Sequence, residues 1–379
     1  MTKPQFTLIP SAYNTSKVYS VLPVNGDGDF DFDRASKGTR VREDGLIEEV
    51  TDNIPRLDWY DSNCPSLLLE PQRTNYASNS GDASQWATVS GSQSVTKTQN
   101  YAISPNGTRT AARIQANATG SNYSLIQLST SSFIGNYAGS VYLKSNTGNT
   151  ENVIVYGRNT SVTSYPIGNE WQRIEIQGSG TSGQNLYLFL GSFPNNGSDE
   201  NVDILVWGGQ LEQGTYTSSY IPTPSITTRI EDVCGNSGSA DLFDITEGSF
   251  FVDVLPYNAG LVSTISLSNN STSQRILIQF QSNGTQVRLF SSGGVSNYQT
   301  ITFNQRNKIL VTFKLNEYKF YINGALVSTD TIATVPTGLD RVNFSNSTAN
   351  SDFFQGEVND TRVYDRVLTE AEAIKLTTI

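Results

Sequence analysis

The sequence predicts an all-β protein with two β-sandwiches in tandem behind an N-terminal β arm. Short stretches of alternating apolar and polar residues recur along the 379-residue chain, with turn residues between them. Charged residues make up only 16% of the chain and aromatic residues 10%, a mixture typical of sheet proteins with polar loops rather than of disordered chains. A single convincing helix signal lies near the C-terminus. The length allows two or three domains.

Residues 1–75 are predicted to form the β arm, which we expect to serve as an attachment region. Acidic and aromatic residues alternate in it, and this spacing places Phe30 and Phe32 on one face of a strand. The aspartates from Asp27 to Asp33 also resemble a calcium loop, but Phe32 occupies the position where an EF-hand needs glycine. A solvated strand face is therefore favoured over a calcium site.

Residues 76–224 are predicted to form the first sandwich, a jelly roll, and residues 225–239 a linker. The prediction rests on short strands at regular spacing with turn residues between them. Pro222 and Pro224 end this part, because proline interrupts a strand and stiffens the exit. The expected strands cover residues 108–114, 124–128, 137–144, 152–156, 172–177, 185–190 and 203–211.

Residues 240–379 are predicted to form the second sandwich. Asn283-Gly284 and Asn323-Gly324 each separate two apolar runs, as expected of tight hairpins. A short helix follows at 369–376, because Thr369 and Glu372 have the spacing of a capping box.

Composition excludes several classes of function. The chain has no histidine, so it cannot hold a Ser-His-Asp triad, a Cys-His pair or a histidine-containing metal site. Its net charge of −10 argues against binding to nucleic acid or to an anionic membrane. No secretion signal precedes residue 20, and no apolar run approaches the roughly 20 residues that span a bilayer. We expect a soluble protein without membrane insertion.

The chain contains two cysteines, Cys64 and Cys234. Two cysteines alone cannot build a zinc site. Each lies just outside one end of the first predicted sandwich, so they could form a disulfide across neighbouring strand ends. The alternative is that both remain reduced and buried.

The second sandwich resembles the concanavalin A-like, laminin-G-type lectin domains. The resemblance rests on the hairpin at 320–324 and on the ending at 356–368 with its capped helix. The family closes its domain with a strand followed by a Tyr-Asp/Asn-Arg-x-Leu-Ser/Thr-x-x-Glu pattern. Residues 363–372, which include Tyr364, Arg366 and Leu368, follow this pattern.

Residues 34–47, 55–75 and 208–234 together resemble a group of tailed-bacteriophage structural proteins. These proteins combine such segments with a carbohydrate-binding-module-like jelly roll and often with a lectin-like domain. Residues 64–75 and 208–216 within these segments are expected to be the opening and closing strands of the first sandwich.

The bacteriophage resemblance implies a fibre, spike or decoration protein on the head or tail of a virion. Such a protein is made in the host cytoplasm and exposed on the released particle. Its partners would be other virion proteins and further copies of itself, with a trimer favoured. Related jelly rolls often carry a calcium-ligating Asp in the final strand, but Trp207 stands at that position here, which argues against a structural calcium.

Sugar binding would use aromatic faces for stacking and amide or carboxylate groups for hydroxyl hydrogen bonds. Several residues are candidates for binding the host-surface glycan that the resemblance leads us to expect. Each of them could instead serve to pack the domain. They are Trp86, Tyr142, Tyr156 and Trp171 in the first sandwich, and Tyr257, Tyr298 and Asn346 in the second.

Glycoside hydrolysis would need two carboxylates a few ångströms apart. Lectin-fold glycanases place them as Glu-x-Asp-x-x-Glu on one strand, a string that this chain lacks. The nearest stretch runs from Glu357 to Asp360, and Asn359 breaks the pattern. Together with the bacteriophage resemblance, which implies a virion appendage, this predicts a non-enzymatic protein without cofactor or metal. A purely structural cementing protein is the main alternative, and a polysaccharide depolymerase the least favoured.

Overall fold

The computed structural model describes residues 3–60, 63–89, 93, 95–117, 124–131, 134–157, 159–181, 183–190, 201–243, 245–347 and 351–379. The chain folds into two compact units. Unit 1 combines Met1–Glu43, Val50–Pro71 and Ile230–Ile379, and unit 2 combines Asp44–Glu49 with Gln72–Arg229.

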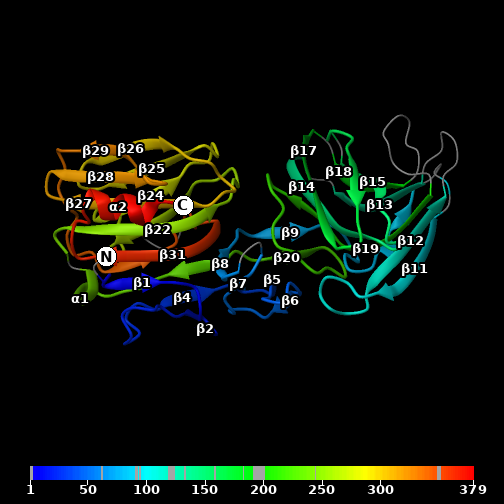
Figure 1. The fold of residues 1–379 in the computed structure, drawn as a ribbon, viewed down its shortest axis with the longest axis horizontal. Coiled ribbons are helices and arrows are strands. Elements are labelled where there is room, and N and C mark those ends of the chain that lie inside the picture. The colour runs from blue at the N-terminus through cyan, green and yellow to red at the C-terminus, as the bar shows by residue number, and fades with distance from the viewer. Residues whose placement is uncertain are drawn as a thin grey trace. The chain divides into compact units, whose positions relative to one another are not determined.

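The larger sheet of unit 1 has eight antiparallel strands, three of which come from the N-terminal part of the chain (Figure 1). The main path runs β29 (Ala325–Asp330), β28 (Glu317–Ile322), β27 (Asn307–Lys314), β22 (Gly248–Pro256), β31 (Gly356–Tyr364), β8 (Ser66–Leu69), β7 (Leu57–Asp58). The eighth strand, β1 (Phe6–Leu8), also pairs with β31. The turn between β28 and β29 is the predicted Asn323-Gly324 hairpin, and both residues have the positive φ that this turn type needs.

A second sheet completes the sandwich of unit 1, and smaller elements border it. Its order is β26 (Val295–Thr300), β25 (Gln286–Ser291), β24 (Arg275–Phe280), β23 (Ser263–Ser268), β30 (Arg341–Asn343). A four-stranded sheet runs β2 (Tyr13–Asn14), β3 (Lys17–Val18), β4 (Phe30–Asp33), β21 (Val233–Gly235). The remaining elements of unit 1 are β5 (Gly38–Val41), α1 (Ala240–Phe243) and α2 (Glu370–Thr377), whereas most of β6 (Ile47–Val50) belongs to unit 2.

Helix α2 begins with the predicted capping box, because Thr369 and Glu372 bond each other's backbone N–H groups. The helix packs on the outer side of β27 and β28, where Leu376 meets Leu310 and Tyr321 (Figure 1). Neither helix of the described chain has the length and apolar character needed to cross a bilayer.

The predicted arm is not a separate part of the protein. Phe6 and Leu8 of β1 are fully buried in the core of unit 1, and Phe30 and Leu67 join the same core. The predicted alternation in β4 is confirmed, because Phe30 and Phe32 point inward while the aspartates between and after them are exposed. The boundary expected near residue 75 therefore differs from the observed one, since most of residues 1–71 complete the second sandwich.

The predicted linker is also part of the folded body. Its residues form β20 (Thr227–Arg229) and β21. Asp232 N donates to Glu70 O at 3.0 Å, so the two ends of unit 1 between which residues 72–229 are inserted lie side by side. Unit 1 is thus a discontinuous domain.

Unit 2 contains two five-stranded antiparallel sheets that enclose its own apolar core. One runs β10 (Ala87–Thr88), β13 (Ser124–Ser131), β18 (Gln184–Leu190), β15 (Glu151–Gly157), β16 (Ser164–Ile167). The other runs β11 (Val95–Ala102), β12 (Ala111–Asn117), β19 (Asn201–Gln213), β14 (Gly135–Ser145), β17 (Gln172–Gly180). A 3-10 turn, η1 (Ala83–Gln85), and a pair formed by β9 (Arg73–Asn75) and β20 complete the unit. The all-β class is confirmed.

Cys64 and Cys234, both among the described residues, are not joined by a disulfide. Cys234 is enclosed in the core of unit 1 because β21 pairs with β4 there. Cys64 is exposed, shortly before β8, so the alternative of two buried cysteines holds only for Cys234. The disulfide that the sequence left open is therefore corrected to two separate thiols.

Candidate functional site

The outer face of the smaller sheet of unit 1 carries a group of arginine and aromatic side chains. Along β24 and β25, Ile276, Ile278 and Leu289 point into the core. Because side chains alternate along a strand, their neighbours Arg275, Arg288 and Phe290 stand on the opposite face. Tyr298 of β26 lies directly across from Arg288 in the register of the sheet.

These side chains contact one another through their charged groups and rings. The guanidinium carbon Cζ of Arg288 lies 4.7 Å from the ring centre of Phe290 and 5.4 Å from that of Tyr298. The Cζ atom of Arg275 lies 5.2 Å from the ring centre of Phe290, and its Nη1 donates to Asn346 Oδ1 at 2.5 Å. We call these five residues (Arg275, Arg288, Phe290, Tyr298 and Asn346) the arginine–aromatic face.

Positive charge dominates this face. Strands β24, β25 and β26 contain no Asp or Glu. Burial lowers the pKa of Arg275, and the neighbouring Arg288 lowers it further, while Asp352 opposes the shift. Neither arginine forms an ion pair with any residue that the structure describes. The two cations are held near one ring without a direct anionic partner.

The structure brings together two of the predicted sugar-binding residues, Tyr298 and Asn346. Tyr298 is 50% exposed, so its ring is accessible to a ligand. Sequence reasoning missed Arg275, Arg288 and Phe290. The alternating pattern of β25, together with hairpin pairing to β26, is the signal that could have placed Arg288 and Phe290 beside Tyr298.

Tyr257, the third candidate in the second sandwich, directly follows β22 of the other sheet. Its hydroxyl donates to Glu357 Oε1 at 3.0 Å, and Ser66 Oγ donates to Oε2 at 2.9 Å. Burial raises the pKa of Glu357, and the nearby carboxyl of Asp58 adds to the increase.

Glu357 and Asp360 do not form the carboxylate pair of a glycanase. A β-bulge at Asn359 shifts the register of β31 against β22 and places Asp360 opposite Asp253. The guanidinium of Arg362 donates to both oxygens of Asp360, from Nε to Oδ1 at 3.0 Å and from Nη2 to Oδ2 at 2.5 Å. The carboxylate of Asp360 is thereby held in a local ion pair.

The candidates of the first sandwich are distributed over different parts of unit 2. Trp86 is only 4% exposed and packs in the core, with its indole N–H donating to Asn79 O. It cannot present its face to a sugar, which corrects its assignment as a binding residue. Tyr156 is half-buried beside Leu125 and Ile154, on the sheet that contains β15.

Tyr142 and Trp171 belong to an aromatic cluster on the outer face of the other sheet of unit 2. Tyr142 meets the Trp207 ring edge-on, with ring centres 5.6 Å apart, and Trp207 packs against Tyr220 at 4.5 Å. Both Trp207 and Tyr220 are buried. Packing therefore accounts for most of this cluster.

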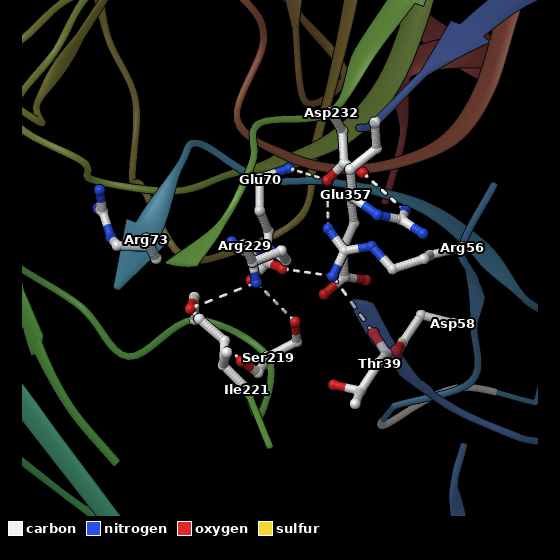
Figure 2. A network of polar contacts seen from close by, with 12 residues as sticks. Thr39, Arg56, Asp58, Glu70, Arg73, Ser219, Ile221, Arg229, Asp232 and Glu357 are labelled. Atoms are coloured by element: carbon white, nitrogen blue, oxygen red, sulfur yellow. Dashed lines mark hydrogen bonds and ion pairs between the residues drawn. The ribbon is translucent and has the colours of Figure 1, made fainter. Parts of the chain in front are cut away.

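A buried ionic cluster joins the N-terminal part of unit 1 to the segment after residue 230 (Figure 2). Arg56 pairs with Glu70 at 2.6 Å and also with Asp232. Arg34 donates to the other oxygen of Asp232 at 3.1 Å. All four side chains are almost fully enclosed. Burial opposes the charge of Arg56, but Asp232 and Glu70 overcome this effect and raise its pKa.

The two distinctive segments do not both lie in unit 2. Strand β8 belongs to the larger sheet of unit 1, so the prediction that residues 64–75 open the first sandwich is wrong for residues 64–71, whereas β9 (Arg73–Asn75) meets residues 208–216 inside unit 2. Asn75 Oδ1 accepts from Leu211 N at 3.0 Å, and Asn75 Nδ2 donates to Gly209 O and to Ile221 O. Glu212 is fully buried and accepts from Ser218 N at 2.8 Å. Burial raises the pKa of Glu212. These residues thus close unit 2 rather than face solvent.

No group of three or more Asp, Glu or Cys side chains that could hold a metal ion occurs within the described ranges. Asp29 and Asp31 of the predicted calcium-like run have protein partners, Ser20 for the first and Lys17 for the second.

Comparison with known families supports the second predicted sandwich. Residues 250–373 match the sequence model of the concanavalin A-like lectin/glucanases superfamily. The chain carries a concanavalin A-like domain. The structure adds β1, β7 and β8 to this domain, all of which precede the matched residues. The search of curated proteins finds no match.

Several solved structures are similar to part of this chain. The CBM40 module of the Ruminococcus gnavus IT-sialidase, solved with alpha2,3 sialyllactose, matches 38% of this chain and 94% of its own, with 18% identity and a TM-score of 0.32. Domain 4 of AbnA, a GH43 arabinanase from Geobacillus stearothermophilus, in complex with arabinotriose, matches 41% and 77%, with 16% identity and a TM-score of 0.33.

A leech intramolecular trans-sialidase matches 38% of this chain and 26% of its own, with 17% identity and a TM-score of 0.31.

Proposed function

We propose that the protein is a non-enzymatic glycan-binding protein and that the arginine–aromatic face of its concanavalin A-like domain is the binding surface. The observation that carries this proposal is the exposed Tyr298 ring beside Arg288, with Asn346 reached through Arg275. A sugar needs an apolar face for its C–H groups and hydrogen-bonding groups for its hydroxyls. This surface offers both.

The test is a glycan array probed with the wild-type protein and with Tyr298→Ala. We expect the variant to lose about tenfold in affinity, since an aromatic contact contributes roughly 0.5–1.5 kcal/mol beyond its buried area. Tyr101→Ala is the matched control, because Tyr101 is 36% exposed but belongs to unit 2. Loss of binding in Tyr101→Ala with no change in Tyr298→Ala would place the site in unit 2 instead. An array without any bound glycan would contradict glycan binding itself.

We further propose that the protein is a bacteriophage virion component, exposed on the released particle as a head or tail appendage and assembled as a homo-oligomer, with a trimer favoured. The support is the resemblance of residues 34–47, 55–75 and 208–234 to such proteins. Light scattering of the purified protein measures the oligomer. Imaging of the intact particle at residue resolution tests the location, and a particle without this chain would contradict the proposal.

A cementing role without sugar binding is the second candidate. The observation that favours it is that the two distinctive segments are used for internal packing around Asn75 and Glu212. A protein that stabilises capsid or tail subunits against dissociation while the glycan array stays silent would have this role.

A further inference from the structure

We infer that the ligand of the arginine–aromatic face is an acidic sugar, recognised through its carboxylate by Arg288 and Arg275. This inference rests on the proposed function and specifies the chemical class of the glycan. It starts from the contrast between this face and the rest of the protein. The chain carries a net charge of −10, yet the three strands of this face contain arginines and no acidic residue.

The guanidinium of Arg288 is available to a ligand. Its Nε donates to Ser296 Oγ at 3.0 Å. Among the described residues its two terminal nitrogens have no hydrogen-bond partner. Contacts with the rings of Phe290 and Tyr298 hold the planar group in place. A guanidinium held in this way presents two parallel N–H groups, the geometry that a carboxylate accepts in a bidentate pair.

Arg275 supplies a second cation. Its Nε atom is buried and lacks a hydrogen-bond partner in the described chain, while its Nη1 is bonded to Asn346. The mutual repulsion of two guanidiniums near one ring favours an anion between or beside them. A neutral sugar would leave this repulsion in place, whereas a carboxylate relieves it.

The tyrosine completes the selectivity for a sugar over a simple anion. A free carboxylate or phosphate would use only the arginines. The exposed ring of Tyr298, directly across the sheet register from Arg288, offers an apolar surface to the pyranose ring that carries the carboxylate. Binding should therefore require both the acidic group and the sugar.

The experiment uses the full-length protein and a panel of uronic-acid and other carboxylated polysaccharides, each paired with its carboxyl-reduced product. We expect binding to carboxylated members, with at least about tenfold weaker binding to their reduced partners, because hydrogen bonds to charged groups contribute roughly 1.5–3 kcal/mol. Arg288→Gln should bind the acidic polysaccharide about tenfold more weakly than the wild type does, and its affinity for the carboxyl-reduced polysaccharide should be unchanged. Arg288→Lys keeps the positive charge but loses the two parallel N–H groups of the guanidinium. Its affinity for the acidic polysaccharide should therefore lie between those of the wild type and Arg288→Gln.

Lys314→Gln is the matched control, because it removes one positive charge from an exposed position on the other sheet of unit 1. It should bind like the wild type. Equal binding of acidic and reduced members would overturn the acidic-sugar inference and leave the proposed function standing. Sulfated polysaccharides without carboxylates complete the panel, and binding confined to them would also overturn the inference. Failure to bind any member of the panel or of the glycan array would overturn both.

Discussion

At the scale of single residues, the protein encloses charges that must be paired to be tolerated. Arg34, Arg56, Glu70 and Asp232 comprise two cations and two anions with almost no exposure. Taking a charge out of water costs several kcal/mol, which a well-formed pair offsets and a broken pair does not. The cluster therefore holds the N-terminal segments and the segment after residue 230 in one arrangement, because any other arrangement would leave a buried charge unpaired.

Replacing Arg56 by Met should lower the free energy of unfolding by about 3–5 kcal/mol, because Glu70 and Asp232 would remain buried without their shared cation. Urea denaturation measures the change. Lys17→Met is the control, because Lys17 pairs with Asp31 at an exposed position, with side chains 47% and 51% accessible. Its cost should stay below about 1 kcal/mol. Equal costs for the two variants would show that the buried cluster contributes no more than a surface pair.

Glu357 should make stability depend on pH. Its pKa is raised in the folded state, mainly by burial and also by Asp58 and Glu70, while hydrogen bonds from Ser66 and Tyr257 oppose the shift. A carboxyl with a raised pKa stabilises the fold most at low pH, and this contribution is lost as pH rises from its unfolded value near 4.5 through its folded value.

The variant Glu357→Gln removes that titration. The wild type should lose this contribution between pH 4 and pH 7, whereas the variant should not. The free energy of unfolding of the variant minus that of the wild type should therefore be larger at pH 7 than at pH 4, as measured by urea denaturation at both values. A difference between variant and wild type that stays constant with pH would contradict the raised pKa of Glu357.

At the scale of elements, the strands before the matched family residues complete the concanavalin A-like domain. Strands β1 and β8 pair with successive halves of the same edge of β31. Phe6 of β1 then meets Phe30 and Phe243 edge-on, at 6.0 and 5.6 Å between ring centres. The N-terminal strands thus cover both the hydrogen-bonding edge and the core of the domain.

Phe6→Ala should lower the free energy of unfolding by about 3–5 kcal/mol, because truncating a fully buried phenylalanine leaves a cavity in the core. Val24→Ala is the control from the same N-terminal region, since Val24 is 90% exposed, and it should change stability by less than about 0.5 kcal/mol. Thermal and urea unfolding of both variants test this. A small effect of Phe6→Ala would mean that β1 is dispensable to the domain.

At the scale of the whole molecule, the chain is built as one domain inserted into another. Residues 72–229 leave unit 1 after Pro71 and return to it at Ile230. The backbone bond from Asp232 to Glu70 keeps the exit and the return adjacent. Insertions are tolerated where the flanking residues of the host domain lie close together, and unit 2 has its own apolar core.

A chain in which residues 1–71 are joined directly to 230–379 through a short Gly-Ser linker should fold with a cooperative thermal transition. A fragment of residues 240–379 alone, the domain expected from the sequence, should not, because it lacks β1, β7 and β8 and all four residues of the buried ionic cluster. Circular dichroism and thermal melting distinguish the two. Cooperative folding of the shorter fragment would contradict the discontinuous domain.

Part of this architecture could be predicted from local patterns. The hairpin at Asn323-Gly324 and the capped helix at Thr369 depend on residues within one or two turns of each other, so their spacing is visible in the sequence. Tyr298 was identified as a sugar-binding candidate from its residue type. Arg288 was missed because its role depends on the strand across from it, and Trp86 was misassigned because its burial depends on a distant core.

The sequence by itself determined the all-β class, the concanavalin A-like ending and the absence of histidine chemistry, because alternation, turn residues and composition are local properties of the chain. Only the tertiary structure decided that most of the first 71 residues belong with the last 150, that the two cysteines stay apart, and that Arg275 and Arg288 share one face with Tyr298. These facts depend on pairings between strands far apart in the chain. The alternation of apolar and polar residues shows which residues share a face of a strand, but it does not show which strands lie beside it. Pairings between distant strands are therefore known only from the assembled sheets.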